Sequence, residues 1–121
     1  MKIPGPDHPI TITPATERVR ITFNGKVVAD SKRALVLQEA AYKPVFYIPR
    51  EDVQMALTER TTNSTHCPYK GDASYYSIKV GDRTAENAIW SYETPFPAMK
   101  EIEGHLAFYP NRVDKIDVEP V

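Results

Sequence analysis

The segment Glu17–Ala29, ERVRITFNGKVVA, decides the fold class of this chain. Over Glu17–Phe23, apolar side chains alternate with polar ones, which is the two-residue period of a strand with one buried face. Asn24 and Gly25 follow, and an apolar run resumes after them. Asn-Gly between two such runs favours a tight turn, because both turn positions take positive φ. The segment therefore predicts an antiparallel β-hairpin.

The rest of the chain predicts more short strands, with β-branched and aromatic residues between turn signals. Most of the eleven prolines lie between these runs, as expected because proline inside a central strand removes a hydrogen bond. The predicted strands are residues 34–38, 45–48, 57–62, 74–80, 83–92, 106–109 and 112–118. Pro49–Asp52 and Pro97–Gly104 predict short helical turns, and Thr65–Gly71 predicts a loop. Roughly eight short strands at this spacing favour a mostly β domain with two antiparallel sheets, barrel-like or sandwich-like.

Residues 1–16 differ from the rest because they are proline-rich and lack helical periodicity. We expect them to form an extended arm packed on the domain, with Ile10 and Ile12 docking, and residues 17–121 to form a single β-rich domain. A chain of 121 residues is near the commonest size for one domain.

Composition excludes several classes of protein. With 15 basic and 16 acidic residues there is no clear nucleic-acid signal, and no run approaches the roughly 20 apolar residues of a membrane span. A single cysteine excludes a disulfide framework within one chain and fits a reducing compartment. The N-terminus shows no apolar signal segment, so a cytoplasmic location is expected. The oligomeric state stays open.

Cys67 is the first candidate for chemistry. His66 precedes it and Lys70 follows three residues later, and a thiol near cationic groups becomes nucleophilic. Neighbours on an extended chain point to opposite faces, however, and the favoured alternative is a small buried cysteine that packs as a hydrophobe. Lys70 is either an anion-binding charge or a solvated loop lysine, and both readings stay open.

Metal binding has little support in the sequence. A structural zinc takes four Cys or His ligands in paired spacing, whereas this chain has one cysteine and three unpaired histidines. We therefore expect no structural zinc, no metal and no cofactor, and a site of two histidines and a carboxylate stays open as the alternative.

Two further clusters of polar and aromatic residues follow predicted strands. Arg50-Glu51-Asp52 offers a guanidinium suited to carboxylate or phosphate, or else a helix start with exposed charges. Trp90, Tyr92 and Glu93 offer aromatic faces beside a carboxylate, with core packing as the alternative for Trp90.

These stretches together resemble a known family. The segments are Val19–Asp30, Tyr47–Val53, Thr65–Ser77, Ala85–Tyr92 and Ile102–Pro110. They look like the bacterial and fungal family catalogued as domain of unknown function 427, which is filed under a nucleotidyltransferase-like label. The resemblance runs from about Pro4 to Ile116, and Cys67-Pro-Tyr-Lys-Gly is its most specific block.

The resemblance implies a β-tent fold, in which two antiparallel sheets meet at an angle. Many members of that fold group, such as methionine sulfoxide reductase B, hold a zinc with four cysteines. This chain has only Cys67, so neither the zinc nor the reductase chemistry carries over. The shared motif residues carry no assigned role; they are Arg50, Glu51, Asp52, Thr65, Cys67, Lys70, Gly71, Tyr76, Trp90, Tyr92 and Glu93.

Three hypotheses follow, with a binding module first. Polar and aromatic residues at strand ends predict a pocket for a small polar or anionic molecule. Its predicted lining is Tyr47, Arg50, Asp52, Thr65, Cys67, Lys70, Tyr76, Trp90, Tyr92 and Glu93. The second hypothesis is an enzyme of unknown reaction, nucleotidyl-transfer-like or dependent on Cys67, with Asp52, His66 or Lys70 assisting. The third is an interaction or scaffold domain.

Overall fold

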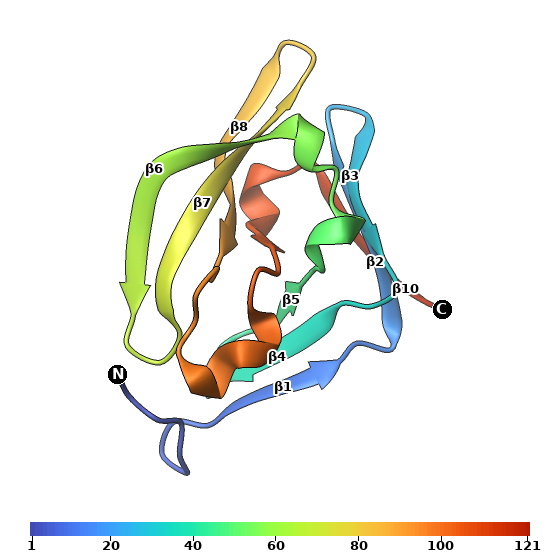
Figure 1. Ribbon diagram of the computed structural model, residues 1–121. Helices are drawn as coiled ribbons and strands as arrows, with labels where there is room; N and C mark the ends of the chain where they lie inside the picture. Colours follow the sequence, from blue (N-terminus) through green and yellow to red (C-terminus); the bar gives the residue numbers. More distant parts are fainter.

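The computed structural model describes residues 1–121 as ten β-strands with four short 3₁₀ turns (Figure 1). The strands are β1 (Ile10–Pro14), β2 (Glu17–Phe23), β3 (Lys26–Ser31), β4 (Leu35–Glu39), β5 (Val45–Tyr47), β6 (Thr58–Cys67), β7 (Gly71–Val80), β8 (Arg83–Ser91), β9 (Ala107–Phe108) and β10 (Lys115–Pro120). The 3₁₀ turns are η1 (Arg50–Asp52), η2 (Met55–Leu57), η3 (Pro97–Ile102) and η4 (Pro110–Arg112). The predictions of a mostly β fold and of short helical turns near residues 50 and 97 are confirmed.

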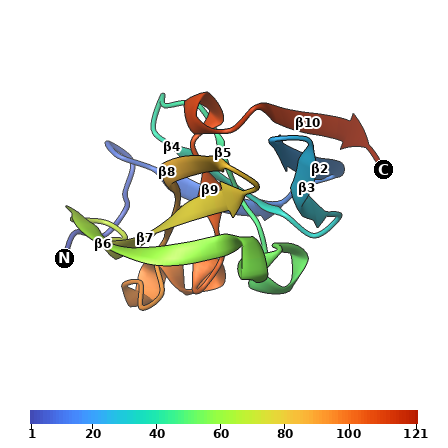
Figure 2. The same cartoon turned by 90° about the horizontal axis from the view of Figure 1, so that it is seen from above.

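The strands form three antiparallel sheets, in the orders β1-β4-β5, β10-β2-β3 and β6-β7-β8-β9. The predicted hairpin is the β2–β3 pair, and its turn residues Asn24 and Gly25 have φ of 49° and 78°. In Figure 2 the sheet of β2, β3 and β10 lies to one side of the other two, and the chain ends at opposite sides of the view.

The sequence interpretation expected two sheets, and the third contains the segment that was expected to be an arm. Ile10–Pro14 is extended, as expected, but it forms β1 and pairs along its whole length with β4. Ile10 and Ile12 are half-buried against the core beneath them. The prolines hid this strand, because they flank it and Pro14 occupies its last position.

Thr65–Gly71 was predicted as a loop, and this prediction was wrong. β6 continues to Cys67, only residues 68–70 form the turn, and β7 begins at Gly71. β6 is the edge strand of its sheet and most of its side chains are exposed, so it lacks the alternating apolar pattern that marks a half-buried strand.

The core consists of two groups of buried side chains. The larger group of 16 residues includes Ile21 and Ile78, and the smaller group of eight includes Leu37 and Tyr47. The register between β7 and β8 shifts after Tyr76, and the extra residues lie in β8, because Tyr76 pairs with Ile89 whereas Ile78 pairs with Ala85. The two successive tyrosines of β7 point to opposite faces of the strand, so they belong to different groups, Tyr75 to the smaller and Tyr76 to the larger.

No helix in the structure has the length and apolar character needed to cross a membrane.

Candidate functional site

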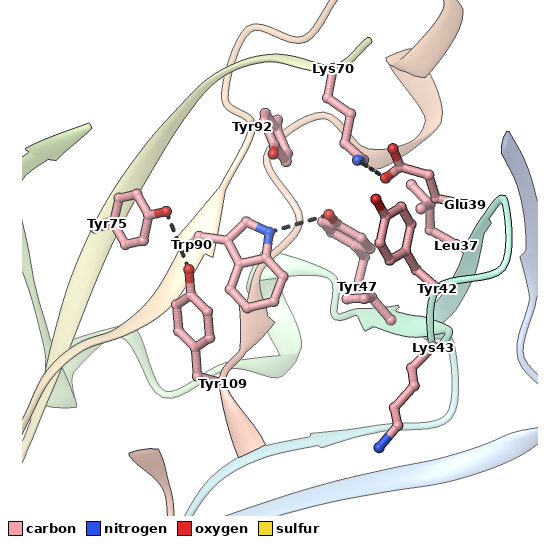
Figure 3. A pocket seen from close by; sticks show the side chains of 11 residues that line it. Leu37, Glu39, Tyr42, Lys43, Tyr47, Lys70, Tyr75, Trp90, Tyr92 and Tyr109 are labelled. Carbon is pink, nitrogen blue, oxygen red and sulfur yellow. Dashed lines mark hydrogen bonds and ion pairs between the residues drawn. The ribbon is translucent and has the colours of Figure 1, made fainter. Parts of the chain in front are cut away.

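A cavity of about 240 Å³ opens beside the smaller core group (Figure 3). Strands β4 and β5 and the segment between them supply one wall, and Lys70, β7, β8 and the residues after β8 and β9 supply the others. In each of β4 and β5 the lining residues are two positions apart, so they share one face of the strand. The lining residues are Leu37, Glu39, Tyr42, Lys43, Val45, Tyr47, Lys70, Tyr75, Trp90, Tyr92 and Tyr109.

Aromatic rings form most of the cavity wall, and they contact one another. The Trp90 and Tyr109 ring centroids are 4.4 Å apart, and Tyr47 meets Trp90 edge to face at 6.3 Å. Trp90 Nε1 donates a hydrogen bond of 3.2 Å to the Tyr47 hydroxyl. The Tyr75 hydroxyl lies 3.3 Å from that of Tyr109 and 2.9 Å from Thr65 Oγ1. These hydrogen bonds fix the ring orientations and leave a preformed pocket.

An ion pair between Lys70 and Glu39 lies in this aromatic wall. Lys70 Nζ donates to Glu39 Oε1 at 2.5 Å, and the two side chains are only 8% and 19% exposed. Burial alone would raise the pKa of Glu39, but hydrogen bonds from Lys70 and His8 outweigh it and hold that pKa below its ordinary value. Lys70 Nζ also lies 3.7 Å from Cys67 Sγ and 6.0 Å from the centre of the Tyr92 ring.

The N-terminal segment reaches this ion pair from outside the cavity. His8 Nε2 lies 2.8 Å from Glu39 Oε2, and the His8 ring stacks on Tyr69 with centroids 4.2 Å apart. The backbone N–H of Lys2 donates to the carbonyl of Pro68 at 2.7 Å. His8, Glu39 and Lys70 therefore form a continuous chain of hydrogen-bonded groups from the N-terminal segment into the cavity.

Three of the cavity tyrosines, Tyr47, Tyr92 and Tyr109, have a pKa above the ordinary value of tyrosine. Burial is the main cause that raises the pKa of Tyr47 and Tyr92, and burial also raises that of Tyr109, to about 12. No hydrogen bond within the protein engages the Tyr92 hydroxyl, and no fully buried polar side-chain atom lacks a partner. The Tyr92 hydroxyl is consequently accessible from the cavity that it lines, as a donor and as an acceptor.

Four of the predicted lining residues lie in this cavity: Tyr47, Lys70, Trp90 and Tyr92. Two more lie directly behind its wall, because Thr65 hydrogen-bonds the Tyr75 hydroxyl and Cys67 contacts the ammonium of Lys70.

The predicted residues Arg50, Tyr76 and Glu93 form a separate network. Glu93 Oε2 accepts from the Tyr76 hydroxyl at 2.7 Å and from Arg50 at 3.1 Å, while Arg60 lies 3.1 Å from Oε1. Burial would raise the pKa of Glu93, but these neighbours lower it below the ordinary value. The expected charging of one pocket by Arg50, Lys70 and Glu93 does not occur. Arg50 and Glu93 bond to Tyr76, which points to the opposite face of β7 from the cavity residue Tyr75.

Asp52 lies in a third place, where it accepts from Ser31 at 2.7 Å and from Arg33 at 3.1 Å. His66 pairs with Asp72 at 2.7 Å on the exposed surface. Of the three proposed assistants, only Lys70 contacts Cys67, and Asp52 and His66 do not. No three His, Cys, Asp or Glu side chains gather in a way that would hold a metal ion.

Sequence reasoning missed Glu39, Tyr42, Lys43 and Tyr109, together with the apolar Leu37 and Val45. Glu39 ends β4 in a stretch without a recognisable motif, and it joins the cavity only through the pairing of β4 with β1 and β5. The strand that carries Tyr75 and Tyr76 was expected to form one wall of the pocket, and of the two tyrosines Tyr75 is the one that lines the cavity.

Comparison with known proteins agrees with the resemblance seen in the sequence. A search among curated proteins found no match. A family profile described as a domain of unknown function (DUF427) matches residues 11–119, from the second residue of β1 to the penultimate residue of β10. The chain therefore belongs to the DUF427 family of domains of unknown function.

Proposed function

We propose that this domain is a binding module for a small polar or anionic molecule that carries a planar ring. The ring lies against the aromatic wall, and its polar edge meets Lys70 and the Tyr92 hydroxyl. One observation carries the proposal: the Lys70–Glu39 ion pair lies within an aromatic cavity of about 240 Å³.

The energetics of the ion pair support a role in binding. Removing two charges from water is expensive, and a buried pair is often replaced by apolar residues without loss of stability. A pair as enclosed as Lys70–Glu39 is therefore a poor device for stabilising a fold. Placed in a cavity wall, the same pair presents charged groups to a ligand.

The charges of the lining favour an anion or a neutral polar group over a cation. Lys43 and Lys70 contribute two positive charges, and Glu39 contributes one negative charge. Each carboxylate oxygen of Glu39 already has one cationic or hydrogen-bonding partner, Lys70 or His8, so part of its capacity to accept an incoming ammonium is taken. Lys70 has three donors, and its two contacts within the protein leave the third for a ligand oxygen.

Three probes of the same ring size test this reasoning by thermal shift: benzoate, benzamide and benzylamine. We expect benzoate or benzamide to raise the melting temperature and benzylamine to have no effect. A ligand at 100 times its Kd stabilises by about 2.7 kcal/mol, which raises the midpoint by several degrees.

The matched variants remove one ion pair each. Lys70→Met/Glu39→Gln should abolish the shift, whereas Lys79→Met/Glu59→Gln, which removes the exposed 2.7 Å pair between β7 and β6, should leave it intact. Stabilisation by benzylamine alone, or an equal response from both double variants, would contradict the proposal.

We also propose a cytoplasmic location, which the unpaired Cys67 supports.

A further inference from the structure

We propose a second binding site, specific for a small apolar group, on the other side of Trp90. A cavity of about 250 Å³ lies between the β10-β2-β3 sheet and strands β5, β8 and β9. Val19, Ile21 and Phe108 form its floor and are at most 6% exposed. The exposed Pro44 and Pro110 lie at its rim.

The lining chemistry identifies the class of ligand. The lining residues are aliphatic, aromatic or proline, and Trp90 Nε1 is their only polar side-chain atom. That N–H already donates to Tyr47, which lines the first cavity. A water molecule needs two to four polar partners to occupy a buried position, and these side chains supply none. The site therefore favours a hydrocarbon over water or an ion.

The size of the cavity sets the size of the group. In another protein, an apolar cavity of about 150 Å³ holds benzene. A volume of about 250 Å³ accommodates one ring with a short alkyl substituent. The buried floor and the exposed proline rim describe a pocket with a mouth, which a small molecule enters without unfolding the domain.

The new site is a neighbour of the aromatic cavity but is chemically distinct from it. Trp90 and Val45 line both cavities, so they form the wall between them. One side of this wall faces the Lys70–Glu39 pair, and the other faces only apolar side chains. The apolar site does not depend on the proposed function, because its argument uses no charged group.

Toluene is the probe for this site, and methyl NMR of the full chain is the readout. We expect saturable shifts in the methyl signals of Val19, Ile21 and Ile116, with little change at Leu37, which lines the first cavity. The only tryptophan is Trp90, so its fluorescence should change along the same titration.

Two substitutions on β10 form a matched pair. Ile116→Phe adds bulk to a residue that lines the cavity and should weaken toluene binding at least about tenfold. Val118→Phe, at an exposed position on the same strand that does not line the cavity, should leave the affinity within about twofold. Shifts of the same methyl groups under xenon pressure test the unmodified chain, so the inference does not depend on how well a variant folds.

Four results would overturn the inference. They are no saturable methyl shift with either toluene or xenon, shifts confined to Leu37, equal affinity in Ile116→Phe and the unmodified chain, and self-association that closes the cavity mouth and excludes toluene.

Discussion

Replacing Lys70 with methionine tests whether the ion pair in the cavity wall behaves as the structure indicates. The substitution keeps the length of the side chain and removes its charge, so Glu39 remains enclosed with only His8 as a partner. Breaking a buried pair by removing one member costs about 3–5 kcal/mol. Because Glu39 is 19% exposed and keeps the His8 contact, we expect about 2–3 kcal/mol at pH 7.

The double variant Lys70→Met/Glu39→Gln separates this cost from general damage to packing. Removing both charges leaves no unpaired carboxylate, so we expect the double variant to lie within about 1 kcal/mol of the unmodified chain. The assay is urea unfolding followed by the fluorescence of Trp90, the only tryptophan.

The pH dependence of the stability lost in Lys70→Met provides a second test. The folded-state pKa of Glu39 lies below its ordinary value of 4.5, so its charge stabilises the fold above pH 4.5, and this contribution is lost as the pH falls through the folded pKa. Without Lys70, burial raises that pKa, and Glu39 takes up a proton at a higher pH. The cost of Lys70→Met should therefore shrink as the pH approaches 4.5.

Three results would refute this reasoning: a single variant as stable as the unmodified chain at pH 7, a double variant no more stable than the single one, or a cost that grows on acidification. The first would mean that the pair is effectively solvated. The second would mean that methionine disturbs the packing rather than the charge balance.

Three further predictions follow from other parts of the structure. Gly71→Ala should destabilise the fold by about 1–2 kcal/mol in urea unfolding, because Gly71 has φ of +113°, where a residue with a side chain is strained. The control, Asp72→Ala at the exposed next position, should have little effect. Ile89→Ala should cost about 2–5 kcal/mol in the same assay, since this fully buried side chain leaves a cavity in the larger core group, and a cost below about 1 kcal/mol would contradict that packing. Glu93→Gln should destabilise the fold by about 1–2 kcal/mol, because it weakens the contacts of Glu93 with Arg50, Arg60 and Tyr76. Benzoate binding, measured by calorimetry, should not change. A loss of binding would mean that the Glu93 network is coupled to the cavity of Lys70 and Glu39.

The features predicted successfully from the sequence are those that depend on local patterns. The hairpin at Glu17–Ala29 followed from strict alternation and the Asn-Gly turn, which need no information from elsewhere in the chain. β6 was cut short because an exposed edge strand carries polar residues on both faces. β1 was missed because its partner, β4, lies more than twenty residues away.

The candidate site was only partly predictable for the same reason. Trp90 stood out as the only tryptophan and Lys70 as part of the block Cys67-Pro-Tyr-Lys-Gly, and both line the cavity. Tyr76 does not line the cavity, because it points to the opposite face of β7 from its neighbour Tyr75, and the sequence does not show which of the two faces borders the cavity. Glu39 became a partner of Lys70 only through a side-chain contact across 31 positions, between β4 of one sheet and the β6–β7 turn of another.

The contact of the N-terminal segment with the cavity has a thermodynamic consequence. His8 contacts Glu39 from outside the cavity while Lys70 contacts it from within, so the carboxylate belongs to both regions. A ligand that changes the Glu39–Lys70 pair must also change the free energy with which the first nine residues dock on the domain. Because linkage is reciprocal, docking of these residues changes the affinity for the ligand by the same free energy. Exchange of the backbone amide of Lys2, which donates to Pro68, would thus report on the cavity from the far end of this chain of contacts.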